Sequence, residues 1–530
     1  MQNESSVQNK SSDKGFLPKA FIMDAKTEPT AIASETRKSS RFLVLLGLLL
    51  MAAAALFVHG YHPYAEDAEI YLPGIEQILH PQLFPMGREF FSSHANLTFF
   101  PNLIALSVRI SHLPFDVVLL LWHVASIFLL LLACWQLASL CFTSARARWA
   151  AVGMVAALLT LPVAGTALYI MDQYLNPRNL AAFASVFAVA RILESKYVRA
   201  MAWLVFAAAV HPMMWAYPFS FCALLVVMRR FEAVIADKLA AEKYALVASC
   251  LLLQFPLNPA STPAYEEAAR RHAFHYIQHW AWYEILGLVA PIALFWWFDR
   301  IAQKKSWVNV QRLCRGLIIY DLVYIVAALI IDLPARFETL GRFQPLRSLH
   351  LLYIVMLVLG GGMLGEFVLK KKTWRWLALF LPMAAGMFVA QRALFPVSAI
   401  VEWPGATPKN PWAQAFLWVR ENTSVDAVFA LDPLYMHAPG EEEVGFRCLA
   451  QRSRMADDVK DNGVVSMFPP LAEEWWAQVE AQSPWESLTL QNYEQLKANY
   501  GVNWILTQEP ELAGLDCPYQ NSVVRVCRVP

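Results

Sequence analysis

The chain has 530 residues, of which 57% are hydrophobic and 16% are charged, and its mean hydropathy is +0.39. A chain this long and this apolar is not a soluble domain, so the composition predicts a polytopic α-helical membrane protein. The formal net charge of +1 combines +10 for residues 1–395 with −9 for the remainder.

The N-terminal part contains a polar stretch followed by an apolar one. Residues 1–36 are rich in Ser, Lys, Asn, Asp and Glu and lack a periodic apolar face, which predicts a disordered cytoplasmic tail. Phe42 to Val58 is an uncharged run of 17 residues, close to the roughly 20 that cross a bilayer as a helix. No small-residue cleavage site follows it, so we expect a membrane span rather than a cleaved signal.

Ten further apolar stretches follow the first one. They are residues 114–142, 149–170, 179–193, 200–210, 213–228, 244–257, 281–298, 313–331, 348–369 and 376–394. Together they predict about eleven transmembrane helices. The break at His211-Pro212 is compatible with two helices or with one kinked hairpin. The run Gly360–Gly365 lies inside an apolar stretch and predicts close helix packing.

Basic residues mark every other loop between these stretches. Clusters of Arg and Lys lie at 37–41, 146–148, 191–199, 229–243, 300–312 and 370–375. Because basic residues concentrate on the cytoplasmic side, this pattern predicts a cytoplasmic N-terminus and a C-terminus outside the cytoplasm. We expect the protein to lie in the plasma (inner) membrane.

The first outer loop, residues 60–113, is long and polar. Within it the spacing of Leu72, Ile75, Ile78 and Leu79 predicts a short amphipathic helix that lies on the membrane surface.

Residues 396–530 have a different character from the membrane region. They carry 18 Asp and Glu against 9 Lys and Arg, and no run is long enough to span. We expect helices at 412–420 and 493–500, the second ending at Gly501, and strands at 427–431, 502–506 and 523–526. This alternation predicts a small extracytoplasmic α/β domain.

Three of the eight cysteines lie in this C-terminal domain. If the domain faces an oxidising compartment, Cys517 and Cys527 can close a hairpin as a disulfide and leave Cys448 free. Unpaired thiols are an equally good interpretation of the sequence.

The first outer loop opens with the carboxylates Glu66, Asp67 and Glu69. Carboxylates at the water-facing end of a span can accept a proton from a hydroxyl group or bind a divalent ion. An ordinary solvated loop explains them equally well. Outer histidines such as His275 and His279 could add metal ligands, but none has a compact zinc spacing.

Arginines on the predicted outer face run against the basic-inside trend. Arg342 and Arg347 precede the tenth span, and Arg178 follows Asn176-Pro177. A guanidinium suits phosphate oxygens, so a phospholipid or polyprenyl-phosphate headgroup is one partner, and Glu338 or the first-loop carboxylates are the alternative. His211 either lines a cavity on the outer face together with these arginines or simply lies at a kink between two apolar stretches.

The arrangement resembles the GT-C class of integral-membrane glycosyltransferases, and within it an uncharacterised bacterial branch. The residues that carry the resemblance are Glu66–Pro73 (EDAEIYLP), Asn176–Arg178 (NPR), His211-Pro212, Arg342–Arg347 (RFQPLR), Trp418–Thr423 (WVRENT) and Phe446–Arg452 (FRCLAQR). The likeness covers most of residues 40–395 and part of the C-terminal domain.

The resemblance implies an inverting transfer of a sugar from a polyprenyl-phosphate donor to a glycan, lipid or protein acceptor outside the cytoplasm. It implies Asp67 as the general base, with Glu66 orienting the acceptor or binding metal. It implies Arg342 and Arg347 as binders of the donor phosphate. Some members bind a divalent ion such as Mg or Mn and others use none, and this chain lacks a clear Asp-x-Asp motif.

We assign Glu69, Arg178 and His211 to substrate binding, and we expect membrane lipids but no nucleic acid among the partners. The alternative hypothesis is a non-enzymatic transporter or scaffold for lipid or polysaccharide export. A transporter of that kind needs polar or broken helices at the bilayer midplane. In this sequence the polar residues gather at the outer edge instead, which favours chemistry at the interface.

Overall fold

The computed structural model describes residues 30–235, 262–332, 340–508 and 514–530. By its internal contacts the chain divides into a short unit, Met1–Gly47, and a large unit, Leu48–Pro530. Most of the predicted tail, residues 1–36, lies outside the described residues, and the first helix begins at Thr30 within it.

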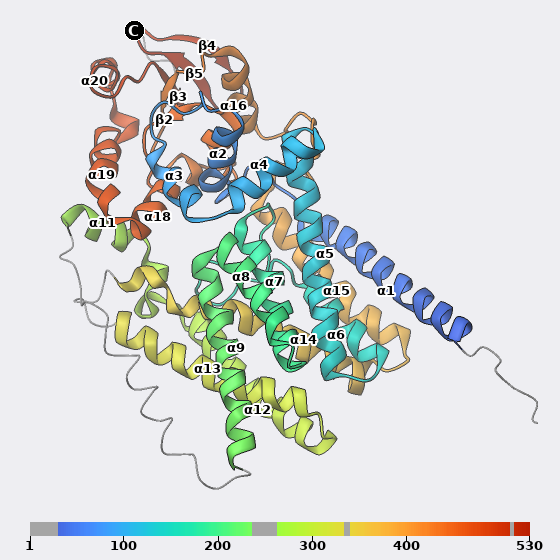
Figure 1. Ribbon diagram of the computed structural model, residues 1–530. Helices are drawn as coiled ribbons and strands as arrows, with labels where there is room; N and C mark the ends of the chain where they lie inside the picture. Colours follow the sequence, from blue (N-terminus) through green and yellow to red (C-terminus); the bar gives the residue numbers. More distant parts are fainter. Residues whose placement is uncertain (1–29, 236–261, 333–339, 509–513) are drawn as a thin grey trace, which may run out of the picture. The chain divides into compact units, whose positions relative to one another are not determined.

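The described structure is mostly helical (Figure 1). Up to residue 235 the helices are α1 (Thr30–His59), α2 (Ala68–Leu79), α3 (Glu89–Leu97), α4 (Phe100–Ser111), α5 (Phe115–Cys141), α6 (Ala145–Ala157), α7 (Pro177–Leu193), α8 (Tyr197–Val210) and α9 (Pro212–Ile235). From residue 262 to residue 394 they are α11 (Pro263–Arg271), α12 (Trp282–Lys305), α13 (Val308–Asp332), α14 (Leu349–Leu364) and α15 (Thr373–Leu394). The C-terminal helices are α16 (Pro411–Asn422), α17 (Phe446–Ala450), α18 (Lys460–Met467), α19 (Ala472–Ala481) and α20 (Leu490–Tyr500).

Among the described residues, seven helical segments are long and apolar enough to cross a membrane. They are Arg41–His59, Phe115–Cys141, Pro212–Arg230, Trp282–Lys305, Val308–Ile331, Leu340–Leu369 and Thr373–Leu394, and each coincides with a stretch predicted from the sequence. Two other predicted stretches form the shorter helices α7 and α8, and 244–257 lies outside the described residues. The predicted total of eleven spans is therefore not confirmed.

The remaining predicted stretch, 149–170, is helical only in its first part. α6 ends at Ala157, and the chain then forms turns in which Pro162 and Tyr169 make an isolated backbone bridge. Pro162 and Gly165 interrupt the helix, because proline lacks an amide hydrogen and glycine favours turns. This irregular segment leads directly into α7 and forms part of the cavity wall described in the next subsection.

The glycine run Gly360–Gly365, which covers the end of α14 and the start of the π-helical turn Gly365–Leu369, packs closely against α6, as the sequence predicts. A Cβ atom added to Gly361 would lie 2.5 Å from the carbonyl oxygen of Ala150, and one added to Gly365 would lie 2.8 Å from the Cα of Ala147. The two helices can approach this closely because neither glycine has a side chain.

The C-terminal region contains a five-stranded sheet. Its strands are β1 (Val428–Ala430), β2 (Ser453–Arg454), β3 (Trp504–Thr507), β4 (Asp516–Gln520) and β5 (Arg525–Arg528). Their order is β2-β1-β3-β5-β4, with β2, β1 and β3 parallel and β5 antiparallel to both β3 and β4. α20 ends at Gly501 with φ +71°, as predicted.

The sheet has an apolar core on each of its faces. Phe429 and Leu506 pack with α16 and α17 on one face, whereas Ala430 and Ile505 pack with α20 on the other. Successive residues of a strand point to opposite faces, which explains this division. The predicted small α/β fold is thus present as a mixed sheet between helices.

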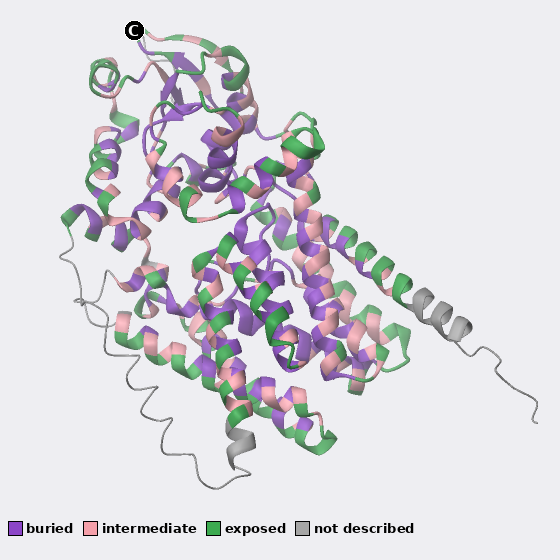
Figure 2. Cartoon of the chain, viewed as in Figure 1, coloured by how far each residue is buried: buried purple, intermediate pink, exposed green. Residues whose placement is uncertain are grey.

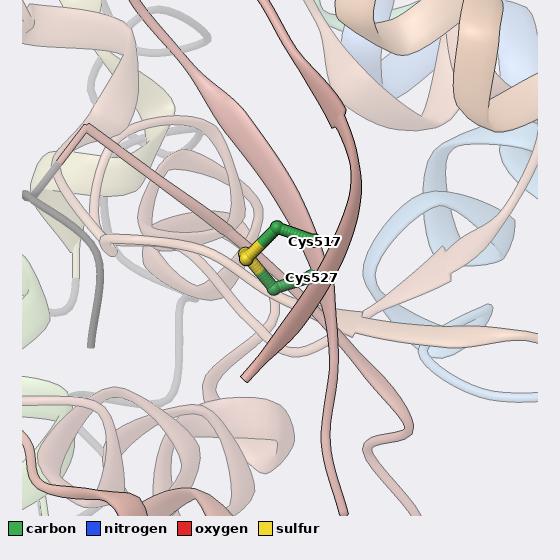
Figure 3. Close-up of a disulfide and its surroundings, with 2 residues drawn as sticks. All are labelled: Cys517 and Cys527. Atoms are coloured by element: carbon green, nitrogen blue, oxygen red, sulfur yellow. A yellow bond between two sulfur atoms is a disulfide. The ribbon is translucent and has the colours of Figure 1, made fainter. Parts of the chain in front are cut away.

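Cys517 on β4 and Cys527 on β5 form a disulfide (Figure 3). The two strands pair antiparallel, which brings the two residues side by side. Cys448 is free and buried. The structure therefore contains the Cys517–Cys527 disulfide, which the sequence alone did not decide.

The predicted amphipathic helix of the first outer loop is α2, but it does not lie on a surface. Its residues Ala68–Glu76 are all buried (Figure 2). The apolar side packs against α3 and α4, and α17 and α18 cover the helix from the C-terminal region. The polar side, which the sequence suggested would face solvent, instead carries Glu69 and Glu76 into contact with C-terminal residues.

Candidate functional site

A cavity of about 1340 Å³ lies inside the large unit. Charged residues of its lining include Glu66, Asp67, Arg178, Arg347, Glu443 and Lys460. Another part of the lining is apolar and comes from Met213 and Ala216 of α9 and Ala327, Ile330 and Ile331 of α13. Both of these helices are candidate membrane spans, so the cavity joins a charged cluster to a wall made of membrane helices.

Glu66 and Asp67 form the turn that precedes α2. Glu66 has φ +59°, a conformation that residues with a Cβ atom rarely adopt. The backbone of Glu443 holds it there by accepting a hydrogen bond from the Glu66 N–H at 2.8 Å. The N–H of Asp67 donates to the hydroxyl of Tyr174 at 3.2 Å. Both carboxylates thereby face the cavity, with side-chain exposures of 34% and 24%.

Arg178 anchors Asp67 from the first turn of α7. Asn176 caps this helix by accepting a hydrogen bond from the N–H of Asn179, and Pro177 occupies the first helical position. The Arg178 guanidinium contacts Asp67 Oδ2 at 2.6 Å and Asp172 Oδ2 at 3.1 Å. The predicted Asn-Pro-Arg motif therefore brings a buried cation to the first-loop carboxylates.

Lys460 enters the same cluster from the start of α18. Its ammonium lies 2.7 Å from Glu66 Oε2, 3.0 Å from Glu443 Oε2 and 3.7 Å from Asp67 Oδ1. Only 10% of its side chain is exposed. Three carboxylates from two distant segments thus converge on one cation of the C-terminal region.

The neighbouring carboxylates Glu66 and Asp67 have different pKa values. Burial raises the pKa of Glu66 to about 7, with help from the negative charges of Glu443 and Asp67 and against the attraction of Lys460. Burial also acts to raise the pKa of Asp67, but Arg178 and Lys460 outweigh it and hold that pKa below its ordinary value. Near neutral pH, Glu66 can therefore exchange a proton, whereas Asp67 remains a carboxylate.

Arg347 is the cation of the cavity that lacks a counterion. It lies in the short 3₁₀ helix Pro345–Ser348 that leads into α14. Among the described residues no carboxylate is within ion-pair distance of it, and its buried Nε has no hydrogen-bond partner. The side chain is half-buried, and a buried donor without a partner is costly unless something compensates it, so an anionic ligand fits this position.

His211 also lines the cavity, between α8 and α9. Its Nδ1 accepts a hydrogen bond from the N–H of Met214 at 3.4 Å. Burial lowers its pKa well below the ordinary value, and the nearby charges of Arg178 and Arg347 act in the same direction. The imidazole is therefore neutral at physiological pH.

Two of the predicted site residues lie elsewhere. Glu69 is 0% exposed and contacts Arg454 at 3.0 Å and Arg447 at 3.5 Å, away from the cavity lining. Arg342 is not part of the lining, and its guanidinium stacks over the ring of Phe343. Glu66, Asp67, Arg178, His211 and Arg347 do meet in the cavity.

Lys460 and Glu443 are functional candidates that the sequence did not indicate. Lys460 is 394 residues from Glu66 in the chain, and Glu443 belongs to a run of three glutamates in an acidic domain. The one available signal was that Lys460 is among only 9 basic residues of that domain.

The charged cluster does not fit a divalent metal. Among the described residues no group of three or more His, Cys, Asp or Glu side chains is arranged to hold a metal ion. Glu66, Asp67 and Glu443 converge, but the Lys460 ammonium already occupies the space between them. We therefore assign no chemical step to a metal.

Comparison with known proteins gives a distant structural likeness. No protein-family model and no curated protein sequence matches the chain. The apo oligosaccharyltransferase of Archaeoglobus fulgidus matches over 88% of this chain and 69% of its own, with 12% identity and a TM-score of 0.43. The oligosaccharyltransferase AglB of the same organism, in complex with an inhibitory peptide and a dolichol-phosphate, matches over 88% and 70%, with 11% identity and a TM-score of 0.46. These values do not assign the chain to that family.

Proposed function

We propose that the protein is an integral-membrane glycosyltransferase that moves a sugar from a polyprenyl-phosphate donor to a glycan, lipid or protein acceptor outside the cytoplasm. The observation that carries this proposal is the composition of the cavity. It combines a carboxylate that can exchange a proton near neutral pH, a half-buried arginine that has no carboxylate partner among the described residues, and an apolar wall made of candidate membrane spans.

The apolar wall and Arg347 account for a donor that is both lipid and anion. Ala327, Ile330 and Ile331 line the cavity from one side of α13, because residues three and four apart share a helix face. An isoprenoid chain can lie against this face with its phosphate at Arg347. A guanidinium presents its donors in a fork that suits phosphate oxygens, and the contact would satisfy the buried Nε.

Glu66 is the general base of the proposed reaction. Its carboxylate takes the proton of the acceptor hydroxyl while the acceptor oxygen forms a bond to the anomeric carbon of the donor sugar. The bond from that carbon to the phosphate oxygen breaks, and the polyprenyl phosphate leaves with the electron pair. A single displacement of this kind inverts the anomeric centre. A base whose pKa lies near the working pH is the most effective, and this favours Glu66 over Asp67.

Asp67 acts on Arg178 rather than on the acceptor in this proposal. Its carboxylate is held by the guanidinium at 2.6 Å and keeps a negative charge near neutral pH. Arg178 in turn lies on the cavity wall, where its charge stabilises the negative charge of the departing phosphate. The resemblance implied Asp67 as the base, and the electrostatics of the site favour the neighbouring residue.

The test is a transfer assay with the purified full-length protein. The protein is incubated in detergent with a panel of radiolabelled polyprenyl-phosphate sugars, and both the release of polyprenyl phosphate and the labelled product are measured. We expect one donor to be consumed by the wild type and by Arg342→Gln, but much more slowly by Glu66→Gln. If no donor is bound or consumed, the proposal is contradicted.

A further inference from the structure

Lys460 belongs to the C-terminal region, yet its ammonium lies in the middle of the charged cluster. It contacts oxygens of Glu66 and Glu443 within 3.0 Å and of Asp67 at 3.7 Å. The ammonium is a compact point charge that donates hydrogen bonds to Glu66 and Glu443 and lies within ion-pair distance of Asp67. Such a charge is stable in a buried place only because these carboxylates compensate it.

The backbone that carries Lys460 is fixed by Asp457. One oxygen of Asp457 accepts the N–H groups of Val459, Lys460 and Asp461 at 3.0, 2.7 and 2.8 Å, so it caps the start of α18. The other oxygen pairs with Arg454, which also binds Glu69 of α2. Lys460 is therefore held in register with α2, the helix that Glu66 and Asp67 precede.

Three converging carboxylates with an empty centre are a typical site for a divalent ion. Mg²⁺ and similar ions need several oxygen ligands at about 2.1 Å, and Asp and Glu supply them. Here the same oxygens surround the Lys460 nitrogen. An ion that entered would lie within a few ångströms of a fixed positive charge, which strongly disfavours its binding.

We propose that the Lys460 ammonium takes the place of a divalent metal ion in this site, holding the three carboxylates together so that the site works without a metal. Where it concerns sugar transfer, the inference rests on the proposed function. Where it concerns metal binding, it rests on the geometry of the cluster alone.

The experiment compares Mn²⁺ binding by the full-length wild type and by Lys460→Met, using the loss of the free Mn²⁺ signal in electron paramagnetic resonance. The Lys460→Met substitution removes the charge, keeps a similar length and leaves the carboxylates without a cation. We expect the variant to bind one Mn²⁺ per chain about 10-fold or more tightly than the wild type, because a like charge at this distance is removed.

Two control variants make the result specific to the cluster. Lys409→Met removes an exposed lysine of the same region and should leave Mn²⁺ binding at the wild-type level. Lys460→Met combined with Glu66→Gln and Glu443→Gln removes two of the three carboxylates and should lose the gained ion. Lys460→Arg keeps a positive charge and should gain no ion.

The inference is contradicted if the wild type already binds one Mn²⁺ that Glu66→Gln removes, or if a folded Lys460→Met gains none. Unfolding midpoints of each variant, measured without metal, establish that the protein is folded. If Lys460→Met does not fold, Lys460→Gln, which also removes the charge, replaces it under the same criterion.

A measurement of transfer activity in EDTA separates this inference from the proposed function. Transfer by the wild type should be unchanged in EDTA, and transfer that EDTA abolishes and Mn²⁺ or Mg²⁺ restores contradicts the inference while supporting the glycosyltransferase. If no donor is ever consumed, the proposed function fails, but the Mn²⁺ measurement still decides whether Lys460 occupies a metal position.

Discussion

Two clusters of charged residues lie on either side of the start of α2, and they differ in what surrounds them. In the sealed cluster, Glu69, Arg447, Arg454, Asp457 and Asp461 are each at most 2% exposed in their side chains and pair with one another. In the open cluster, Glu66, Asp67, Arg178, Glu443 and Lys460 line a cavity that also contains the unpaired Arg347.

The difference shows how neighbouring residues acquire different roles. Glu66 and Asp67 precede the helix and point into the cavity, whereas Glu69 lies in its first turn and points to Arg447 and Arg454. Glu66 has a left-handed backbone, φ +59°, and lies before the helix, so the helix does not dictate its direction, whereas the first turn of α2 fixes the direction of Glu69. The sealed cluster fixes the C-terminal region against α2, and the proposed reaction would take place in the open cluster that this geometry positions.

The largest expected effect is on the rate of transfer when the open cluster loses its base. Glu66→Gln should lower kcat by about 10²–10⁴-fold, the usual contribution of a general base. The side chain keeps its size and its contact with Lys460, so the unfolding midpoint should stay close to that of the wild type. A variant that is folded and fully active would place the base elsewhere, with Asp67→Asn as the next test.

The sealed cluster should respond in stability instead. Arg447→Met leaves the three buried carboxylates Glu69, Asp457 and Asp461 with Arg454 as their one remaining guanidinium in the cluster, and removing one partner of a buried ion pair costs about 3–5 kcal/mol. We expect a clearly lower unfolding midpoint in detergent, with kcat per folded molecule close to the wild-type value. A strong fall in kcat without a loss of stability would show that Arg447 takes part in the reaction.

A smaller effect is expected on donor affinity. Arg347→Met removes a charged hydrogen-bond donor worth about 1.5–3 kcal/mol, which corresponds to an affinity for the polyprenyl-phosphate donor about 10–150-fold weaker. Arg342→Gln is the matched control, because Arg342 lies outside the cavity lining. Equilibrium binding of a labelled donor measures the affinity of both variants. If Arg347→Met and Arg342→Gln lost affinity equally, the distinction between the two arginines would be wrong.

The smallest effect on stability is expected for an exposed ion pair of the C-terminal region. Arg528 and Asp516 are 3.1 Å apart, but their side chains are 60% and 65% exposed. Asp516→Asn should change stability by less than about 1 kcal/mol, because solvent and salt screen such pairs. A loss of stability as large as that of Arg447→Met would mean that burial does not determine how much these ion pairs contribute to stability.

Local sequence patterns predicted the parts of the fold that depend on local chemistry. Apolar runs located the seven candidate spans, and Gly501 marked the end of α20 because glycine accepts a left-handed conformation. Five of the predicted site residues meet in the cavity, because each stands beside the end of an apolar segment.

The parts that could not be predicted depend on contacts between distant segments. Lys460 joins Glu66 across 394 residues, and Arg454 joins Glu69 across 385. Nothing in the spacing near α2 shows that its polar side will meet two arginines, so a surface helix was the natural expectation. The low pKa of Asp67 likewise arises from Arg178 and Lys460, both remote in the sequence.

The most direct test of the account is the pH dependence of kcat/KM for transfer by the wild type. The base must be unprotonated to act, so with a pKa of about 7 for Glu66 the activity should be full above neutral pH and fall tenfold per unit below it. Burial and the charges of Lys460, Glu443 and Asp67 set the pKa of Glu66 and with it this midpoint, and Lys460→Met should move the midpoint to higher pH because the ammonium favours the charged carboxylate. A wild-type midpoint at or below the ordinary pKa of a carboxyl group, or one that Glu66→Gln leaves in place in its residual activity, would contradict the assignment of Glu66 as the base.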